Sequence, residues 1–385
     1  MALKNLDKAA ARLKEAVKKG ERIILYGDAD LDGVCSAIIM QETLKSLGGN
    51  IVRVYFPDRE NDGYGITQKA LEELKTFSPA LLCAMDLGIS NFKEIKEAKK
   101  LGFDVILVDH HVVLGKLPDA DIIVDPKQDG DTYPFKELAA CGLTFRLAEE
   151  ILGNKMSSAM RKSLVELAAI GTIADMMVRE QDNNEIIEEG METLENSWRP
   201  GVRAFFDIQE LKKFPNIESK LQKMISILNV RDVEDGYPAS FRILSSDSER
   251  EVTLITERLL EVHELRRQQR DRLLAKVRND ILEKKDESIV FEGGEDFDYI
   301  LLGGLASIIS QEEKKPTFMY RKMKEECIGS VRAPSGQDTV EAMKHCKEYT
   351  ITYGGHPQAS GFRVEHKNLE KFKSCLIEYF KEQNG

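Results

Sequence analysis

The stretch YGDADLDGVCS, at residues 26–36, places three carboxylates at alternate positions directly after an apolar run. Asp28, Asp30 and Asp32 could begin a calcium-binding loop, or they could stand at the end of a strand and hold a catalytic metal. A calcium loop of this type needs Glu at its twelfth position, where this sequence has Ile39. The residues before Asp28 also have the pattern of a strand rather than a helix. We therefore favour a metal site at a strand end.

Other apolar runs also end in groups that can bind a divalent cation. ALLCAM is followed by Asp86, and AAIGTIA is followed by Asp175. DVILV is followed by Asp109, His110 and His111. Each segment alone has a structural explanation, as a helix cap for the aspartates or a turn for the histidines. Because ligand sites of open parallel sheets lie beyond the carboxyl ends of the strands, the four segments together indicate one shared site.

So many carboxylates in one place would require cations. Like charges a few Å apart raise one another's pKa values or destabilise the fold. Carboxylate and imidazole ligands suit Mn²⁺ or Mg²⁺, and the absence of cysteine at these positions argues against structural zinc. Two ions about 3.5–4 Å apart could activate a water and stabilise the leaving oxygen of a phosphoryl group. The residue types therefore indicate two-metal phosphoryl chemistry.

The elements that must position these groups alternate in type over the first 125 residues. Apolar strand-like runs are followed by helical patterns, which predicts a parallel sheet with helices on both faces. Residues 134–230 are mostly helical in pattern. We expect strands at 21–28, 51–56, 80–86, 104–109 and 121–125, and helices at 34–48, 67–77 and 91–102.

The remaining sequence is organised around one long charged segment. Residues 248–285 contain no Gly or Pro and have regularly spaced apolar positions, which predicts one connecting helix about 50 Å long. The last 100 residues predict a second, smaller α/β domain. Its strand-like runs lie at 299–304, 316–321, 327–332 and 360–365, and the expected domains are 1–195, 196–285 and 286–385.

Composition narrows the class of protein. The 385 residues are 42% hydrophobic and 31% charged, which is ordinary for a soluble chain of two or three domains. No apolar run approaches the roughly 20 residues that span a bilayer, and the first 20 residues lack the apolar core of a signal peptide. The six scattered cysteines form no CxxC, so we expect reduced thiols in a cytoplasmic protein. The net charge of −11 argues against indiscriminate binding of nucleic acid through a basic surface.

With these residues in view, the sequence resembles a known family. Asp109-His110-His111 after a strand, with Asp-x-Asp-x-Asp-Gly upstream, is similar to the signature of the DHH phosphoesterases. The stretch GGHPQASG at 354–361 resembles the motif of their DHHA1 domain. Within this superfamily the sequence most resembles the RecJ-type single-strand exonucleases. Further stretches that carry the resemblance lie at 56–67, 125–148, 171–177 and 263–270.

The resemblance implies a two-metal site, usually supported by manganese with magnesium as the alternative, in a cleft between the DHH and DHHA1 domains. Asp86 would bridge the ions, Asp109 would orient a neighbouring imidazole, and His111 would face the scissile phosphate. Glycines let the backbone approach a phosphate, and the arginine fork matches phosphate oxygens. The implied metal ligands are Asp28, Asp30, Asp32, Asp86, His110 and Asp175, and the implied phosphate contacts are Arg59, Ser330, Arg332, Gly355 and His356.

The family resemblance also implies an activity. We expect a phosphodiesterase that hydrolyses single-stranded DNA or RNA from an end, with replication or repair proteins as further partners and no membrane. Two alternatives stay open: hydrolysis of oligoribonucleotides, phosphoadenosine phosphate or cyclic dinucleotides, and a scaffold role in a replication assembly. The sequence stops soon after the GGH segment, so we expect no OB-fold domain for single-strand binding. Val233 stands where RecJ-type proteins usually have an arginine.

Overall fold

The structure is a computed structural model that describes residues 2–59, 62–113, 115–284 and 287–384. The chain forms two compact units that divide between Val262 and His263. The domain limits predicted at 1, 286 and 385, the predicted helix end at 285, and residues 60 and 61 of the 56–67 stretch lie outside the described residues. The predicted boundary between 195 and 196 stays a prediction.

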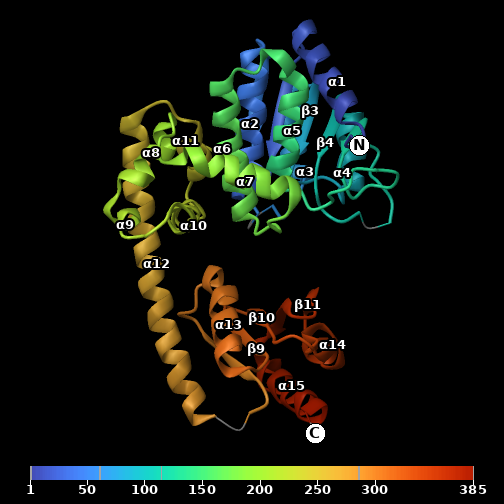
Figure 1. Cartoon of the computed structure of the whole chain (residues 1–385). Helices are drawn as coiled ribbons and strands as arrows, with labels where there is room; N and C mark the ends of the chain where they lie inside the picture. The colour runs from blue at the N-terminus through green and yellow to red at the C-terminus, as the bar shows by residue number, and fades with distance from the viewer. Residues whose placement is uncertain (1, 60–61, 114, 285–286, 385) are drawn as a thin grey trace. The chain divides into compact units, whose positions relative to one another are not determined.

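The first unit is built on a five-stranded sheet with the order β2-β1-β3-β4-β5 (Figure 1). All neighbouring strands pair in parallel. The central strands are apolar throughout and buried on both faces, as strands covered by helices on two sides must be. The five predicted strands are confirmed, with ends shifted by at most two residues: β1 (Ile23–Gly27), β2 (Ile51–Tyr55), β3 (Ala80–Met85), β4 (Phe103–Val108) and β5 (Ile122–Val124).

Helices cover both faces of this sheet, as predicted. Successive side chains of a strand point to opposite faces. Leu25 therefore packs in one core and Ile24 in the other. The first core is covered by α1 (Leu6–Lys19), α2 (Leu31–Ser46) and α5 (Ala140–Leu152), and the second by α3 (Gln68–Leu74) and α4 (Phe92–Lys100).

The second half of the first unit is helical, as its pattern predicts. Close packing of α6 (Ser158–Ala174) and α7 (Gln181–Leu194) depends on Gly190, because a Cβ there would lie 2.4 Å from Cβ of Ala169. The remaining elements are α8 (Pro200–Asp207), α9 (Gln209–Lys212), α10 (Ile217–Leu228), the hairpin of β6 (Val233–Glu234) and β7 (Tyr237–Pro238), and α11 (Ala239–Ser245). Short 3₁₀ turns lie at Lys75–Phe77, Gly153–Lys155, Lys347–Tyr349 and His366–Asn368.

One 35-residue helix, α12 (Glu249–Glu283), runs through the boundary between the two units. Its first turns bury Val252 and Leu259 in the core of the first unit. Its last turns bury Leu273 and Val277 in a core of the second unit. The long helix predicted from residue 248 is confirmed over the described residues, and its 35 residues span about 52 Å.

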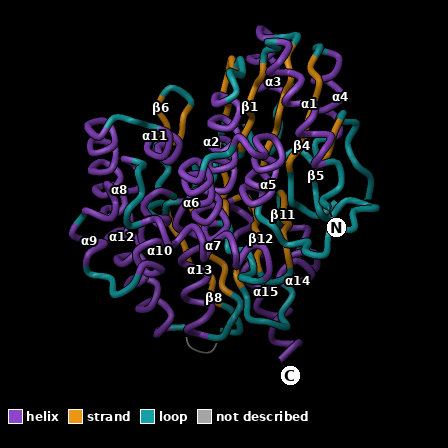
Figure 2. The backbone as a smooth tube through the Cα atoms, turned by 45° about the horizontal axis from the view of Figure 1, so that its top comes forward, coloured by secondary structure: helices purple, strands orange, loops and turns teal. Residues whose placement is uncertain are grey.

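The second unit holds a mixed five-stranded sheet with the order β11-β12-β10-β9-β8. Figure 2 labels three of these strands, β8, β11 and β12. Its strands are β8 (Val290–Gly294), β9 (Thr317–Lys322), β10 (Glu326–Arg332), β11 (Thr352–His356) and β12 (Ala359–Glu365). Only the β8–β9 pairing is parallel. One face is covered by α13 (Tyr299–Glu313) and the end of α12, the other by α14 (Thr339–His345) and α15 (Leu369–Asn384). The predicted smaller α/β domain is confirmed.

Two predictions for the second unit are wrong. The expected strand at 299–304 is the start of α13, which Asp298 caps by accepting a hydrogen bond from the backbone N–H of Ile300 at 3.2 Å. A short apolar run has no period that separates helix from strand. Cys346 and Cys375 form a disulfide rather than two reduced thiols, because the fold brings the end of α14 against the middle of α15. The four other cysteines are free and buried, and no helix among the described residues is long and apolar enough to cross a membrane.

Arg199, directly before α8, joins the helices of the first unit. Its guanidinium donates to both carboxylate oxygens of Glu42, at 2.7 and 2.6 Å, and to Oγ of Ser163 at 2.5 Å. It also donates to the carbonyl oxygen of Leu244 at 3.1 Å. These partners lie in α2, α6 and α11, so one buried cation links three helices to α8.

We expect Arg199→Met to lower the free energy of unfolding of the first unit by about 3 kcal/mol, because it leaves Glu42 without its partner in a largely buried place. Arg203→Met is the matched control. The partner of Arg203, Glu249, is 79% exposed, so its loss should cost at most about 0.5 kcal/mol. Urea denaturation followed by circular dichroism measures both. Equal losses in the two variants would contradict the role of Arg199.

Candidate metal centre

The strand order brings the predicted ligands to one edge of the first sheet. From β1 the chain crosses to β2 on one side, and then returns to place β3 on the other side of β1. Ligand sites of such sheets lie at the carboxyl ends of the strands where the order reverses. Asp28 follows β1 and Asp86 follows β3, the two strands at this point, and Asp109 follows the adjacent β4. The predicted gathering of these residues is therefore built into the topology.

His110 faces three carboxylates. Its Nε2 lies 3.3 Å from Oδ1 of Asp86, 3.6 Å from Oδ2 of Asp175 and 3.8 Å from Oδ2 of Asp32. The three carboxylates come from the end of β3, the C-terminus of α6 and the first turn of α2. Asp175 follows a helix, whereas Asp86 follows a strand. It nevertheless lies beside His110, as the sequence predicts. Asp32, His110 and Asp175 form one group whose oxygen and nitrogen atoms could hold a cation.

A second group consists of Asp28, Asp30 and Asp86, whose ligand oxygens all lie within 4.8 Å of one another. Asp86 also forms a group with His110 and His111, so its carboxylate stands between the two sets of ligands. Its backbone has φ 65°, a left-handed conformation that is rare outside glycine and is tolerated by Asp and Asn. Two adjacent ligand groups with one carboxylate between them can accommodate a pair of divalent cations.

Helix N-termini hold two of the carboxylates. Asp30 caps α2 by accepting a hydrogen bond from the backbone N–H of Gly33 at 3.1 Å. Asp32 accepts two more, at 2.8 and 2.7 Å, from the backbone N–H groups of residues 140 and 141 at the start of α5. The positive ends of both helices therefore offset part of the charge. Gly33 is required by packing as well, because a Cβ there would lie 2.4 Å from the carbonyl oxygen of Asp28.

The electrostatics of the metal-free cluster are unfavourable to ionised carboxylates. Burial, followed by repulsion from neighbouring aspartates, raises the pKa of Asp86 well above its usual range. Burial and the charge of Asp32 raise the pKa of Asp175 to about 6. Burial also raises the pKa of Asp32 itself. A bound divalent cation would favour the ionised form of each of these groups, which is the state that metal ligation needs.

Asp109 lies behind the two groups and holds His111. It is fully buried and accepts hydrogen bonds from the backbone N–H groups of Ile89, His110 and His111 at 2.9, 2.8 and 3.2 Å. Nδ1 of His111 donates to the same carboxylate at 2.7 Å. This bond raises the pKa of His111 to about 8. Burial alone would raise the pKa of Asp109, but the bond and charge of His111 lower it, so the pair is ionic at neutral pH.

Arg59 lies directly on the second ligand group. Its Nε donates to Oδ1 of Asp28 at 2.6 Å, and its Nη2 lies 2.6 Å from Oδ2 of Asp28 and 2.7 Å from Oδ2 of Asp30. The guanidinium also lies over the ring of Tyr64, 5.1 Å from the ring centre. The residue predicted to contact a phosphate is thus paired with predicted metal ligands.

In the second unit, Ser330 and Arg332 share one face of β10. Nη1 of Arg332 donates to Oγ of Ser330 at 3.3 Å. The covering helix α13 presents Gly303 to this pair. A Cβ at Gly303 would lie 3.3 Å from Nη2 of Arg332 and 3.5 Å from Oγ of Ser330. The glycine therefore leaves room beside the two predicted phosphate contacts.

His356 lies two strands away from Arg332 on the same face. Arg332 is opposite Ala359 of β12, and Ala359 is opposite His356 of β11. Residues directly opposite in a sheet share a face, so the small Ala359 separates the side chains of Arg332 and His356. Gly355 has φ 127°, and a Cβ there would lie 2.7 Å from the carbonyl oxygen of Ala359. The two glycine-rich and basic segments predicted to bind phosphate thus meet on one sheet.

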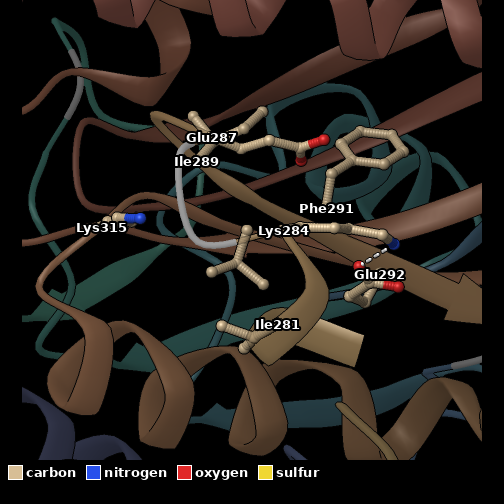
Figure 3. Close-up of a pocket in the computed structure, with 8 residues that line it drawn as sticks. Ile281, Lys284, Glu287, Ile289, Phe291, Glu292 and Lys315 are labelled. Atoms are coloured by element: carbon tan, nitrogen blue, oxygen red, sulfur yellow. Dashed lines mark hydrogen bonds and ion pairs between the residues drawn. The ribbon is translucent and has the colours of Figure 1, made fainter. Parts of the chain in front are cut away.

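A separate small pocket of the second unit contains none of the predicted site residues (Figure 3). It is lined by apolar side chains such as Ile281 and Phe291 and by charged groups near the end of α12. Lys284 donates to Glu292 at 2.5 Å across it. Glu287, another charged residue of the lining, accepts from Lys373 at 3.0 Å, so the pocket gives no indication of a ligand site.

Two residues near the centre were not predicted. Met176 directly follows Asp175, has φ 57° and is 90% exposed, and no sequence signal distinguishes it from a core methionine. Asp125 follows β5 as Asp109 follows β4. It is buried, and burial raises its pKa to about 7. The end of an apolar strand was a usable signal for Asp125, although it belongs to neither ligand group.

The Asp109–His111 pair should make metal-free stability depend on pH. A histidine whose pKa is raised on folding contributes stability that is full below its unfolded value, near 6.5, and is lost as the pH rises through about 8. The side chain of His111 is 57% exposed, so screening limits this contribution to less than about 1 kcal/mol. Urea unfolding in EDTA should therefore show a larger advantage of wild type over His111→Gln at pH 6 than at pH 9. An advantage that does not change with pH would contradict the pairing.

Known proteins share the domains of this chain. The DHH family N-terminal domain matches residues 22–172, and the DHHA1 domain matches residues 286–382. The single-stranded-DNA-specific exonuclease RecJ of Bacillus subtilis is 33% identical over 98% of this chain and 48% of its own length. RecJ of Thermus thermophilus is 27% identical over 98% of this chain and 55% of its own length. The chain thus spans about half the length of these two relatives.

Solved structures show the same fold. A crystal structure of exonuclease RecJ bound to manganese matches with a TM-score of 0.83 and 25% identity, covering 99% of this chain and 95% of that chain. RecJ from Thermus thermophilus in complex with Mn²⁺ shares the fold with a TM-score of 0.82, covering 99% of this chain and 55% of that chain. Together these similarities show that the chain contains a DHH family N-terminal domain and a DHHA1 domain, and that it is similar to exonuclease RecJ over nearly its whole length.

Proposed function

We propose that the chain is a metal-dependent phosphodiesterase that hydrolyses single-stranded DNA from an end and releases nucleotides. The observation that carries this proposal is the position of Asp86 between two ligand groups, with His110 and His111 beside it. The relatives named as single-stranded-DNA-specific exonucleases support the choice of substrate. A cytoplasmic location and contacts with replication or repair proteins belong to the same proposal.

We propose two divalent cations as cofactors, Mn²⁺ in the first place and Mg²⁺ as the alternative. The available donors fit, because they are carboxylate oxygens and imidazole nitrogens without a thiolate. Asp28, Asp30 and Asp86 would hold one ion. Asp32, His110 and Asp175, with Asp86 between the sites, would hold the other. When bound, such ions supply an activated water and stabilise the leaving oxygen of a phosphodiester.

The remaining predicted residues would act on the phosphate. Asp109 positions the His111 ring and keeps it protonated at neutral pH, so His111 can offer a positive charge where a phosphorane would carry negative charge. Arg332 and Arg59 have the planar fork that binds two phosphate oxygens at once. Ser330 and His356 add shorter donors, and Gly355 allows the backbone to approach a phosphate.

The substrate assay uses 20-nucleotide strands of DNA or RNA, labelled at the 5′ or 3′ end, in the presence of Mn²⁺. We expect single-stranded DNA to be converted to mononucleotides, and blunt duplex DNA to be degraded at least about tenfold more slowly, because a duplex end must first be unpaired. The label that is released first gives the direction of digestion. Faster turnover of dinucleotides than of 20-residue strands would favour the small-nucleotide alternative. Equal rates on single strand and duplex would contradict the proposal.

Asp86→Asn tests the metal centre. Asn keeps the size of the side chain and tolerates the left-handed backbone, whereas it removes the charge that both ligand groups use. We expect nuclease activity to be abolished and the melting temperature to stop rising with Mn²⁺. In EDTA the variant should be at least as stable as wild type, since one buried carboxylate has left a repelling cluster.

Asp104→Asn is the matched control for this substitution. Asp104 lies near the start of β4, at the end of the strands opposite to the ligand groups. Its side chain is 60% exposed and pairs with Arg12. It should keep its activity and its response to Mn²⁺. Full activity of Asp86→Asn would show that the cluster is not the reaction centre.

A further inference from the structure

We infer that Arg59 is a built-in counter-cation of the metal-free centre, which competes with a divalent cation for Asp28 and Asp30 and is released when that cation binds. This inference rests on the proposed metal centre. Arg59 would have two partners, which it binds one after the other. It would bind the carboxylates of Asp28 and Asp30 before the cation arrives, and a phosphate afterwards.

The contacts of Arg59 are shorter and more buried than those of an exposed surface ion pair. Three nitrogen–oxygen distances of 2.6–2.7 Å join it to two carboxylates. Asp28 has only 9% of its side chain exposed, and Arg59 has 29%. Bidentate, charge-assisted contacts of this kind are among the strongest hydrogen bonds in proteins. The side chain is therefore held at the metal ligands.

The carboxylate oxygens that Arg59 uses are those that a cation would need. Both oxygens of Asp28 face Arg59, and Oδ1 of Asp28 also accepts the backbone N–H of Ala29 at 2.7 Å. Asp30 gives Oδ1 to the backbone N–H of Gly33 and Oδ2 to Arg59. A cation bound to the same oxygens would stand beside the guanidinium charge, which costs free energy that departure of Arg59 removes.

The effect of Arg59 on its partners agrees with this competition. Burial would raise the pKa of Asp30, but the charge of Arg59 and the hydrogen bonds to Asp30 lower it. Asp28 remains with a raised pKa, because burial outweighs the same guanidinium.

The competition has a consequence for substrate binding. The Nε and Nη2 edge of the guanidinium that holds the carboxylates is the edge that would bind a phosphate in bidentate fashion. Arg59 can present this edge to a phosphate only after it has left Asp28 and Asp30. Cation binding would therefore precede the Arg59–phosphate contact, and binding of either one would favour the other.

The experiment measures Mn²⁺ binding by titration calorimetry, without nucleic acid, in wild type and Arg59→Met. Met fills a similar volume without charge. We expect the variant to bind Mn²⁺ about tenfold more tightly, because no internal cation must be displaced. In EDTA its melting temperature should fall below that of wild type, and saturating Mn²⁺ should restore it.

Arg231→Met is the charge-matched control. Arg231 lies between α10 and β6 and donates to Asp58, the residue before Arg59, at 2.7 Å, so this variant removes one positive charge next to the loop of Arg59 and keeps the contacts to Asp28 and Asp30. Its affinity for Mn²⁺ should stay within about threefold of wild type, as expected for a screened surface charge. Arg59→Lys retains the charge but loses the fork, and should bind Mn²⁺ with intermediate affinity, which keeps the test available if Arg59→Met does not fold.

The outcomes separate the two proposals. If wild type does not bind Mn²⁺, the proposed metal centre fails, and the inference about Arg59 fails with it. If wild type binds Mn²⁺ but Arg59→Met binds no more tightly than Arg231→Met, only the competition is overturned. Tighter binding in Arg59→Met, with Arg59→Lys between it and wild type, supports the competition.

Discussion

The mutual repulsion of buried carboxylates is the constraint around which the first unit is built. Asp32 and Asp86 are almost completely enclosed, and Asp28 is nearly so. Positive charge or its equivalent comes from the N-termini of α2 and α5 and from the guanidinium of Arg59. A divalent cation in each ligand group would offset the charge of these carboxylates.

The backbone fixes the distances at which this repulsion acts. The strand order forces the ends of β1 and β3 to be neighbours, and the left-handed backbone of Asp86 and the absent Cβ of Gly33 then allow an approach that other residues would resist. Residues in such conformations cost stability and persist only where the surrounding structure determines them. Asp86 and Gly33 therefore serve to position the carboxylates rather than to stabilise the fold.

The sequence predicted the sheet and most of the centre for the same physical reason. A buried parallel strand is an apolar run, and a carboxylate after such a run must lie at the sheet edge, so Asp28, Asp86 and Asp109 could be placed by pattern alone. Asp175 follows a helix and its position depends on α6 packing against α2, which no local period encodes. The pairing of Arg59 with Asp28 could not be predicted either, since it depends on the loop that follows β2. The predictions of a strand at 299–304 and of reduced thiols at Cys346 and Cys375 were wrong, because a short apolar run and two distant cysteines carry no tertiary information.

The helices that bring charge to the centre are anchored by their opposite ends. Helix α2 begins with Asp32 at the repelling cluster, and three turns later its Glu42 binds Arg199. Helix α6 ends next to Asp175, and near its beginning Ser163 binds the same guanidinium. Repulsion between Asp32 and Asp175 would act at one end of the two helices, and the buried Arg199 joins them nearer the other. The spacing of these two predicted ligands would then depend on a residue that touches neither of them.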